Sequence, residues 1–83
     1  MSIYEEIAKE HQYQDTKWGG KTHDDEHNMR DWVSFIVSYL GRTVDGQADW
    51  GRNIVLARTY FIKVAALCVA TVEAIDRKLK LPN

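Results

Sequence analysis

The apolar segment from Ile54 to Leu79 constrains the fold of this 83-residue chain more than any other feature. No glycine or proline interrupts it, and its alanine, leucine and glutamate residues favour helix. At a rise of about 1.5 Å per residue, the segment predicts a helix about 39 Å long. A domain of this size cannot enclose such a helix completely, so the rest of the chain has to be arranged around it.

Apolar residues cover more than one side of the predicted helix 54–79. One side carries Phe61, Val64, Cys68, Val72 and Ile75, with Leu67 and Ala70 beside them and Ala65 and Val69 beyond. A helix that is apolar around much of its girth needs neighbours on several sides. The chain offers only two further helices, so we expect a second copy of the protein to supply the remaining neighbour, in a homodimer or a homotetramer.

The length of the chain indicates one small domain, residues 1–83. A chain this short buries only about 60 % of its unfolded surface, and such domains usually depend on disulfides, a metal or oligomerisation. Cys68 is the single cysteine, so no internal disulfide can form, and its place in the apolar segment predicts a buried thiol. We therefore expect either a bound metal or oligomerisation to stabilise the domain.

The charge of the chain limits its partners. A net charge of −1 and a pI near 6.3 give no general field that would attract nucleic acid or an anionic membrane. Residues 1–10 lack the apolar core of a signal peptide. The purest apolar run, Val64 to Ala70, is far shorter than the ~20 residues that cross a bilayer. We therefore expect a cytoplasmic protein with no membrane partner and no general nucleic-acid binding.

A first helix is expected at the N-terminus, where Ser2 and Glu5 form the pattern of a capping box. Its apolar stripe fades near Gln14. The polar segment 15–27, which contains two adjacent glycines, is predicted to be a loop.

A second helix is expected after Asn28, which with Asp31 has the pattern of an N-cap. Its buried face is predicted to carry Trp32, Val33, Phe35, Ile36, Tyr39 and Leu40. Asp49 is the expected cap of the long helix. No segment alternates with period two for long enough to be a strand. The predicted fold class is all-α, a three-helix unit in which two helices flank a long C-terminal one, assembling into a homo-oligomeric helical bundle.

The densest polar cluster of the sequence is the run 23–27. Two histidines four residues apart share one face of a helix, and histidine and carboxylate side chains bind divalent metals. The simpler interpretation is a solvated acidic segment whose charges favour the N-terminus of the next helix. We expect capping and packing to order this run, with no metal. The alternative is Mg²⁺ or another divalent metal bound by His23, Asp24, Asp25 and His27.

Two further positions have both a packing and a binding interpretation. Trp18, followed by two glycines, can fill the gap between helices or stack on a flat ligand. Lys63 interrupts the apolar segment and either extends along the helix to solvent or, with Thr59 and Tyr60, lines a pocket for an anion. The sequence contains no nucleophile triad, no glycine-rich phosphate motif and no paired-cysteine metal site.

Short matches in a consistent order suggest a family. They begin at Gln14-Asp15-x-Lys17-Trp18-Gly19 and resume at Asp31-Trp32, at Gly41 and across residues 64–77. In these pieces the chain resembles the small phage-type members of the MazG-like, all-α nucleotide pyrophosphohydrolases. The resemblance touches most of the chain and implies an all-α scaffold with a nucleotide site.

The resemblance also implies a loss of function. The family's second helix carries a Glu-Glu-x-x-Glu set that holds magnesium on the phosphates of the substrate. In the register of the matches, the corresponding positions here are Ser38, Tyr39 and Arg42, with Thr59 and Tyr60 in the following helix. Mg²⁺ requires hard, negative oxygen ligands, which these side chains do not supply. The chain is therefore expected to keep the scaffold without the catalytic metal.

Arg42 suggests direct contact with a phosphate in place of contact through a metal. A guanidinium group grips phosphate oxygens in a bidentate fork. The alternative is a charge at the C-terminal end of a helix, where the helix dipole favours a cation. The predicted ligand-binding residues are Lys17, Trp18, Tyr39, Arg42, Thr59, Tyr60 and Lys63.

The sequence is compatible with three functions. The first is the non-catalytic binding or sequestration of a nucleotide-like, phosphorylated small molecule by a phage or prophage protein that forms homo-oligomers. The second is a divergent, metal-dependent nucleotide pyrophosphohydrolase. The third is a protein-interaction module that uses the apolar helix as its binding surface.

Overall fold

The structure, a computed structural model, describes residues 1–43 and 50–80, with residues 50–53 described for their backbone alone. Four helices fill these ranges: α1 (Ile3–Trp18), α2 (Gly20–Asp25), α3 (Met29–Thr43) and α4 (Trp50–Leu79). No strand occurs in them, so the predicted all-α class and the long C-terminal helix are confirmed. The predicted three-helix unit is corrected to four helices. The expected cap Asp49 lies outside the described residues.

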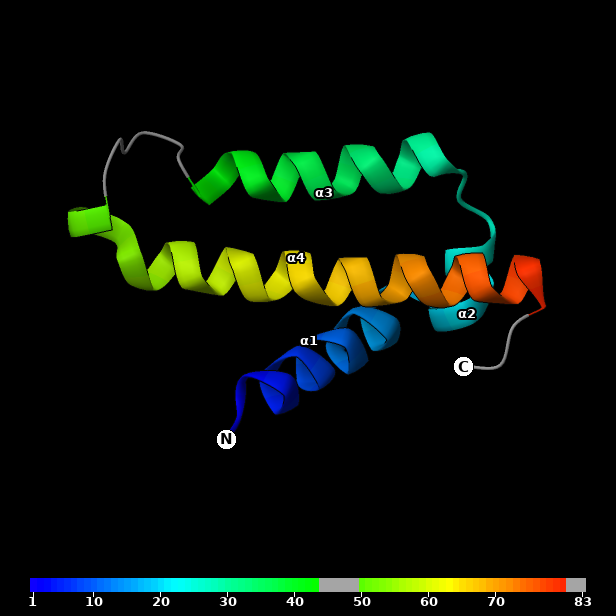
Figure 1. Ribbon diagram of the computed structural model, residues 1–83, viewed down its shortest axis with the longest axis horizontal. Helices are drawn as coiled ribbons and strands as arrows, with labels where there is room; N and C mark the ends of the chain where they lie inside the picture. Colours follow the sequence, from blue (N-terminus) through cyan, green and yellow to red (C-terminus); the bar gives the residue numbers. More distant parts are fainter. Residues whose placement is uncertain (44–49, 81–83) are drawn as a thin grey trace.

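Helix α4 lies between its two main neighbours, as predicted (Figure 1). Helix α3 runs antiparallel to α4 along one side, and α1 crosses it on the other. The short helix α2 packs on both α1 and α4 near the C-terminal end of α4. Within the described ranges α1 and α3 do not touch each other, so each is held in place through α4.

Helix α1 begins as the sequence predicts and ends later. The Glu5 amide donates to Ser2 Oγ and the Ser2 amide donates to Glu5 Oε1, both over 3.1 Å, which completes the capping box. The helix continues past Gln14 to Trp18. It ends where Gly19 adopts a left-handed conformation with φ 105°, a position that favours glycine.

The predicted loop 15–27 is wrong for most of its length, because α1 and α2 together occupy residues 15–18 and 20–25. Polar composition did not reveal a helix of six residues between Gly19 and the next cap. The predicted cap of α3 is confirmed. The Asp31 amide donates to Asn28 Oδ1 over 3.0 Å, and the Asn28 amide donates to Asp31 Oδ2 over 3.1 Å.

The core is small and rich in alanine. Its buried apolar residues among those described are Trp32, Ala57, Val64, Ala66, Leu67, Ala70 and Ala74. Phe35, Ile36 and Tyr39 of α3 pack against it, as predicted, whereas Val33 and Leu40 are exposed. The prediction of a buried Cys68 thiol is wrong for the single chain, because Cys68 lies on a side of α4 that neither α1 nor α3 covers.

Charged pairs hold α1 against α4. Arg58 donates to both carboxylate oxygens of Glu6, over 2.8 and 2.6 Å. This hydrogen bond lowers the pKa of the Glu6 carboxyl. Lys63 Nζ lies 3.4 Å from Glu10 Oε2, so this lysine neither extends freely to solvent nor faces α3. The exposed Arg58–Glu6 pair fixes orientation more than it adds stability.

The segment Ile54–Leu79 of α4 is long and apolar enough to cross a membrane by length and composition alone. The core helix of a soluble protein meets the same criterion. In this structure Arg58 and Lys63 of the segment pair with α1, and Arg77 pairs with Asp25 of α2. Cytoplasmic location stays a prediction.

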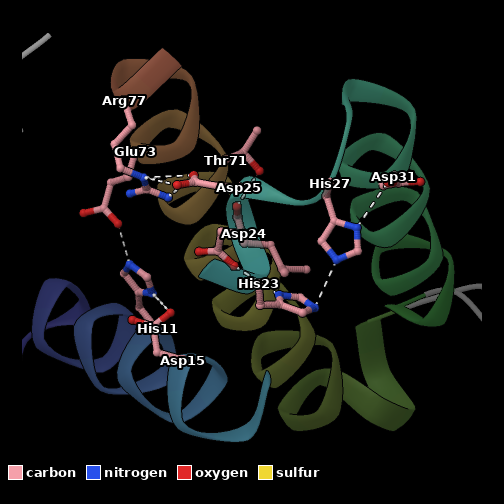
Figure 2. Close-up of polar contacts among 11 residues, drawn as sticks. His11, Asp15, His23, Asp24, Asp25, His27, Asp31, Thr71, Glu73 and Arg77 are labelled. Carbon is pink, nitrogen blue, oxygen red and sulfur yellow. Dashed lines mark hydrogen bonds and ion pairs between the residues drawn. The ribbon is translucent and has the colours of Figure 1, made fainter. Parts of the chain in front are cut away.

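A third contact between α1 and α4 responds to pH. His11 Nε2 lies 2.7 Å from Glu73 Oε1 (Figure 2). Burial lowers the pKa of His11, but the hydrogen bond to Glu73 and the charges of Asp15 and Glu73 together outweigh it. The pKa of His11 is therefore raised above its ordinary value of 6.5.

We predict that this pair stabilises the protein in acid. Because the pKa of His11 is higher in the folded state than in the unfolded state, protonated His11 stabilises the fold. This stabilisation is complete below the unfolded pKa of about 6.5 and is lost as the pH rises through the raised pKa. His11→Gln should therefore lower the free energy of unfolding more at about pH 5.5 than at about pH 8.5. Urea unfolding followed by circular dichroism measures both. Equal losses at the two pH values would contradict the assignment, and Glu73→Gln should reproduce the pH dependence.

Candidate functional site

A pocket of about 340 Å³ lies between α1, α2 and α3, with α4 contributing to its wall. Its volume falls at the lower end of the range for small-molecule sites. It is lined by Gln14, Asp15, Trp18, His23, Asp24, His27, Trp32, Phe35, Ser38, Tyr39, Arg42, Leu67 and Ala70. Only the last two come from α4, so most of the pocket is built by residues 14–42.

Aromatic rings form much of the pocket wall. Trp32 is buried, and Phe35 meets it edge-to-face with ring centroids 6.1 Å apart. Trp18, at the end of α1, stacks loosely on His23 with ring centroids 6.3 Å apart. Trp18 also packs against the core, so its two predicted roles are compatible in this position. Rings fixed in this way offer flat apolar surfaces to a planar ligand.

Gln14 adds a polar group that the sequence did not single out. Its side chain is only 5 % exposed, and its Nε2 donates to Glu10 Oε2 over 3.0 Å and to the Lys63 carbonyl over 3.3 Å. The Gln14 Oε1 atom is buried and has no hydrogen-bond partner among the described residues. A buried acceptor without a donor costs roughly 1–3 kcal/mol. Gln14 is also one of the residues that line the pocket.

Arg42 is the cation of the pocket. It is exposed, and its guanidinium carbon lies 4.7 Å from the centroid of the Tyr39 ring, which orients it by a cation–π contact. In the described ranges no carboxylate forms an ion pair with it. Tyr60 lies beside Tyr39, with ring centroids 6.2 Å apart, but does not line the pocket.

The structure brings three of the seven predicted ligand-binding residues into this pocket, namely Trp18, Tyr39 and Arg42. Lys17 is exposed and its ammonium group lies over the Trp18 ring at 5.4 Å. Thr59 is exposed and donates to the Val55 carbonyl. Lys63 belongs to the α1 side through Glu10. The missed residues Gln14 and Asp15 belong to the motif that carried the family resemblance, which was the available signal.

The residues of the pocket do not fit the magnesium site that the resemblance implies. Ser38, Tyr39 and Arg42 do reach the pocket from α3, as the register predicted, but they offer a hydroxyl, a phenol and a cation. Thr59 and Tyr60 add no carboxylate. Among residues 1–43 and 50–80, no group of three or more histidine, cysteine or acidic side chains is placed to hold a metal ion.

The alternative metal set His23, Asp24, Asp25 and His27 is not assembled as predicted. Asp25 instead faces Arg77, whose Nε donates to Asp25 Oδ1 over 3.0 Å (Figure 2). This hydrogen bond lowers the pKa of the Asp25 carboxyl. Asp24 is buried and lies beside the Nδ1 atom of His23 at 3.3 Å.

The two histidines nevertheless converge. His23 Nε2 and His27 Nε2 are 3.0 Å apart, and His27 Nδ1 lies 3.1 Å from Asp31 Oδ2 (Figure 2). Together they form a continuous row of polar contacts from Asp24 through both rings to Asp31. The backbone amide of Asn28, and then His27, lower the pKa of the Asp31 carboxyl.

Comparisons of the chain with protein-family models, with curated proteins and with solved structures find no match.

Proposed function

We propose that the protein binds a nucleotide-like, phosphorylated small molecule in the pocket between α1 and α3, without converting it. The observation that carries this proposal is one pocket that combines aromatic walls, an unsatisfied buried acceptor and an arginine without a carboxylate partner among the described residues. A base would stack on Trp18 or Tyr39. Its amino group would donate to Gln14 Oε1, and Arg42 would bind the phosphate.

Binding without conversion is supported by the types of residue present. Magnesium-dependent hydrolysis of a pyrophosphate bond needs carboxylates that hold the cation on the phosphates. In the family that the chain resembles, these carboxylates come from the second helix. The corresponding positions of this chain are Ser38, Tyr39 and Arg42. Sequestration of a nucleotide-derived compound by a phage or prophage protein in the cytoplasm is one form of this function.

We further propose that the protein acts as a homo-oligomer through one apolar face, the α3–α4 face. It consists of the exposed side chains Val33, Val37 and Leu40 of α3 and Phe61, Cys68, Val72 and Leu79 of α4. On α3 they follow the spacing i, i+4, i+7, and on α4 the spacing i, i+7, i+11, i+18. Each spacing places its stripe on one face of its helix. Because α3 and α4 pack against each other, we propose that the two stripes form one continuous surface.

A second copy suits this face for two reasons. Among the described residues of a single chain no large side chain is fully buried, so covering the face would enlarge the small core. Two such two-helix layers packed face to face make a four-helix bundle, in which small residues such as Cys68 permit close approach. An anionic membrane is a poorer occupant, because the chain carries a net charge of −1.

The pocket is tested by changing its arginine. Arg42→Ala should weaken nucleotide binding about tenfold or more, because a charge-assisted hydrogen bond contributes roughly 1.5–3 kcal/mol. Arg42→Glu should weaken it further through repulsion of the phosphate. Isothermal titration with nucleoside monophosphates, cyclic nucleotides and nucleotide-derived signals measures the change. Arg30→Ala, an exposed arginine of the same helix outside the pocket, is the matched control.

Three outcomes, from this titration and from an assay for pyrophosphate, would count against the proposal. If the wild type binds a nucleotide and Arg42→Ala binds it equally well, the ligand lies elsewhere. If the wild type releases pyrophosphate from a nucleoside triphosphate in the presence of a divalent metal, the protein is the divergent pyrophosphohydrolase instead. Failure to bind any nucleotide would favour the interaction module.

The oligomer is tested at Val72, which is 55 % exposed in the single chain. Val72→Glu should leave each chain folded and give monomers in sedimentation, because it places an unpaired charge in the apolar interface. Ala66→Glu is a poorer probe, because Ala66 is fully buried within one chain. Val55→Glu, 77 % exposed and off the α3–α4 face, should not change the assembly. A folded wild-type monomer at micromolar concentration would overturn this proposal.

A further inference from the structure

We infer that His23 and His27 bind one divalent transition-metal ion of the Zn²⁺ class at the wall of the pocket. The ligand atoms are the two Nε2 atoms, and Asp24 and Asp31 orient the rings without touching the metal. This ligand set differs from the four-residue set considered from the sequence. It also does not depend on the proposed nucleotide site, since the metal is tested alone.

Proton counting shows why the pair attracts a cation. A neutral imidazole has one N–H group and one lone pair, and an ionised carboxylate can only accept hydrogen bonds. Asp24 Oδ1 lies 3.3 Å from His23 Nδ1, and Asp31 Oδ2 lies 3.1 Å from His27 Nδ1. In two neutral rings that both donate to these carboxylates, each Nδ1 atom would carry the ring proton. Two Nε2 lone pairs are left facing each other across 3.0 Å, an arrangement that a positive centre between or beside them stabilises.

The separation of the two nitrogens suits a shared metal. Zinc binds histidine nitrogen at about 2.0–2.1 Å, so an ion at that distance from both atoms subtends an angle of about 90° between them. This angle is that of adjacent ligands in an octahedron, and a small movement of either ring opens it to the tetrahedral value. The ring planes are inclined at 72° with centroids 4.4 Å apart, so the rings meet at an angle at their Nε2 corners (Figure 2).

The surroundings match those of a metal-binding histidine pair. Metal-binding histidines nearly always donate their second ring N–H to a carboxylate or carbonyl, and here the Nδ1 atom of each ring lies within hydrogen-bonding distance of a carboxylate. Asp31 is itself fixed by the Asn28 amide at the start of α3. The Phe35 ring meets His27 edge-on with centroids 5.0 Å apart, which limits rotation of that ring. Two carboxylates also balance the charge of a divalent ion.

The site has room to complete its coordination. His23 and His27 both line the pocket, so the remaining positions of the ion face its interior and can take water or an oxygen atom of a small molecule. Nitrogen ligands favour zinc, nickel, cobalt or copper over magnesium. The site is thus different in kind from a carboxylate magnesium site.

The test uses the full chain without an affinity tag, freed of metal and titrated with Zn²⁺ or Ni²⁺ alone. We expect saturation at one ion per chain and a rise in the melting temperature, since a ligand that binds only the folded state stabilises it. His23→Gln and His27→Gln should each abolish saturable binding. Asp31→Asn should weaken it by about 10- to 100-fold, as for other partners of metal-binding histidines.

His11→Gln is the matched control, because it removes a histidine outside the pair and should leave the binding unchanged. Circular dichroism of each variant shows whether it is folded. Two results would overturn the inference. One is a folded wild type that takes up no ion at one equivalent, with a single shared Nε2 proton seen by NMR. The other is binding that persists in a folded His23→Gln or His27→Gln variant.

Discussion

The close packing of two helices on the small residues of α4 is the constraint on which the rest of the structure depends. Ala66, Ala70 and Ala74 are buried along α4, where large side chains would push α1 and α3 away. Because α1 and α3 do not touch each other in the described ranges, their relative position is set entirely by this helix and by the connection through α2. The pocket exists because the two helices stand apart on one side of α4.

The two sides of the α3–α4 layer differ in chemistry. The pocket side gathers charged, amide and aromatic groups, and charged pairs with α4 fix α1 beside it. The side chains of the α3–α4 face are exposed and apolar. None of them lines the pocket, so the proposed site and the proposed oligomer surface use different residues of the same two helices.

The sequence predicted the elements that depend on local patterns. The capping boxes at Ser2 and Asn28 and the long apolar helix all appear as expected, because each rests on residues a few positions apart. The sequence failed where tertiary context decides. The polar segment that was predicted to be a loop forms α2, between the left-handed Gly19 and the cap of α3 at Asn28. Lys63 pairs with Glu10 of α1, which lies 53 positions earlier in the chain, and no rule of local spacing predicts such a contact.

The site was predicted only in part. The register of the family resemblance named Tyr39 and Arg42, and both line the pocket. The sequence placed the end of the first helix near Gln14 and did not predict its burial, which follows from the crossing of α1 over α4 and not from its neighbours in sequence.

Helix α3 carries two sets of residues on different faces, because pocket residues and residues of the α3–α4 face alternate along 33–42. Inserting one residue early in this helix would turn everything after it by about 100°. The aromatic wall would then rotate away from the pocket and valines would rotate towards it, so the length of α3 is as much a part of the site as its composition.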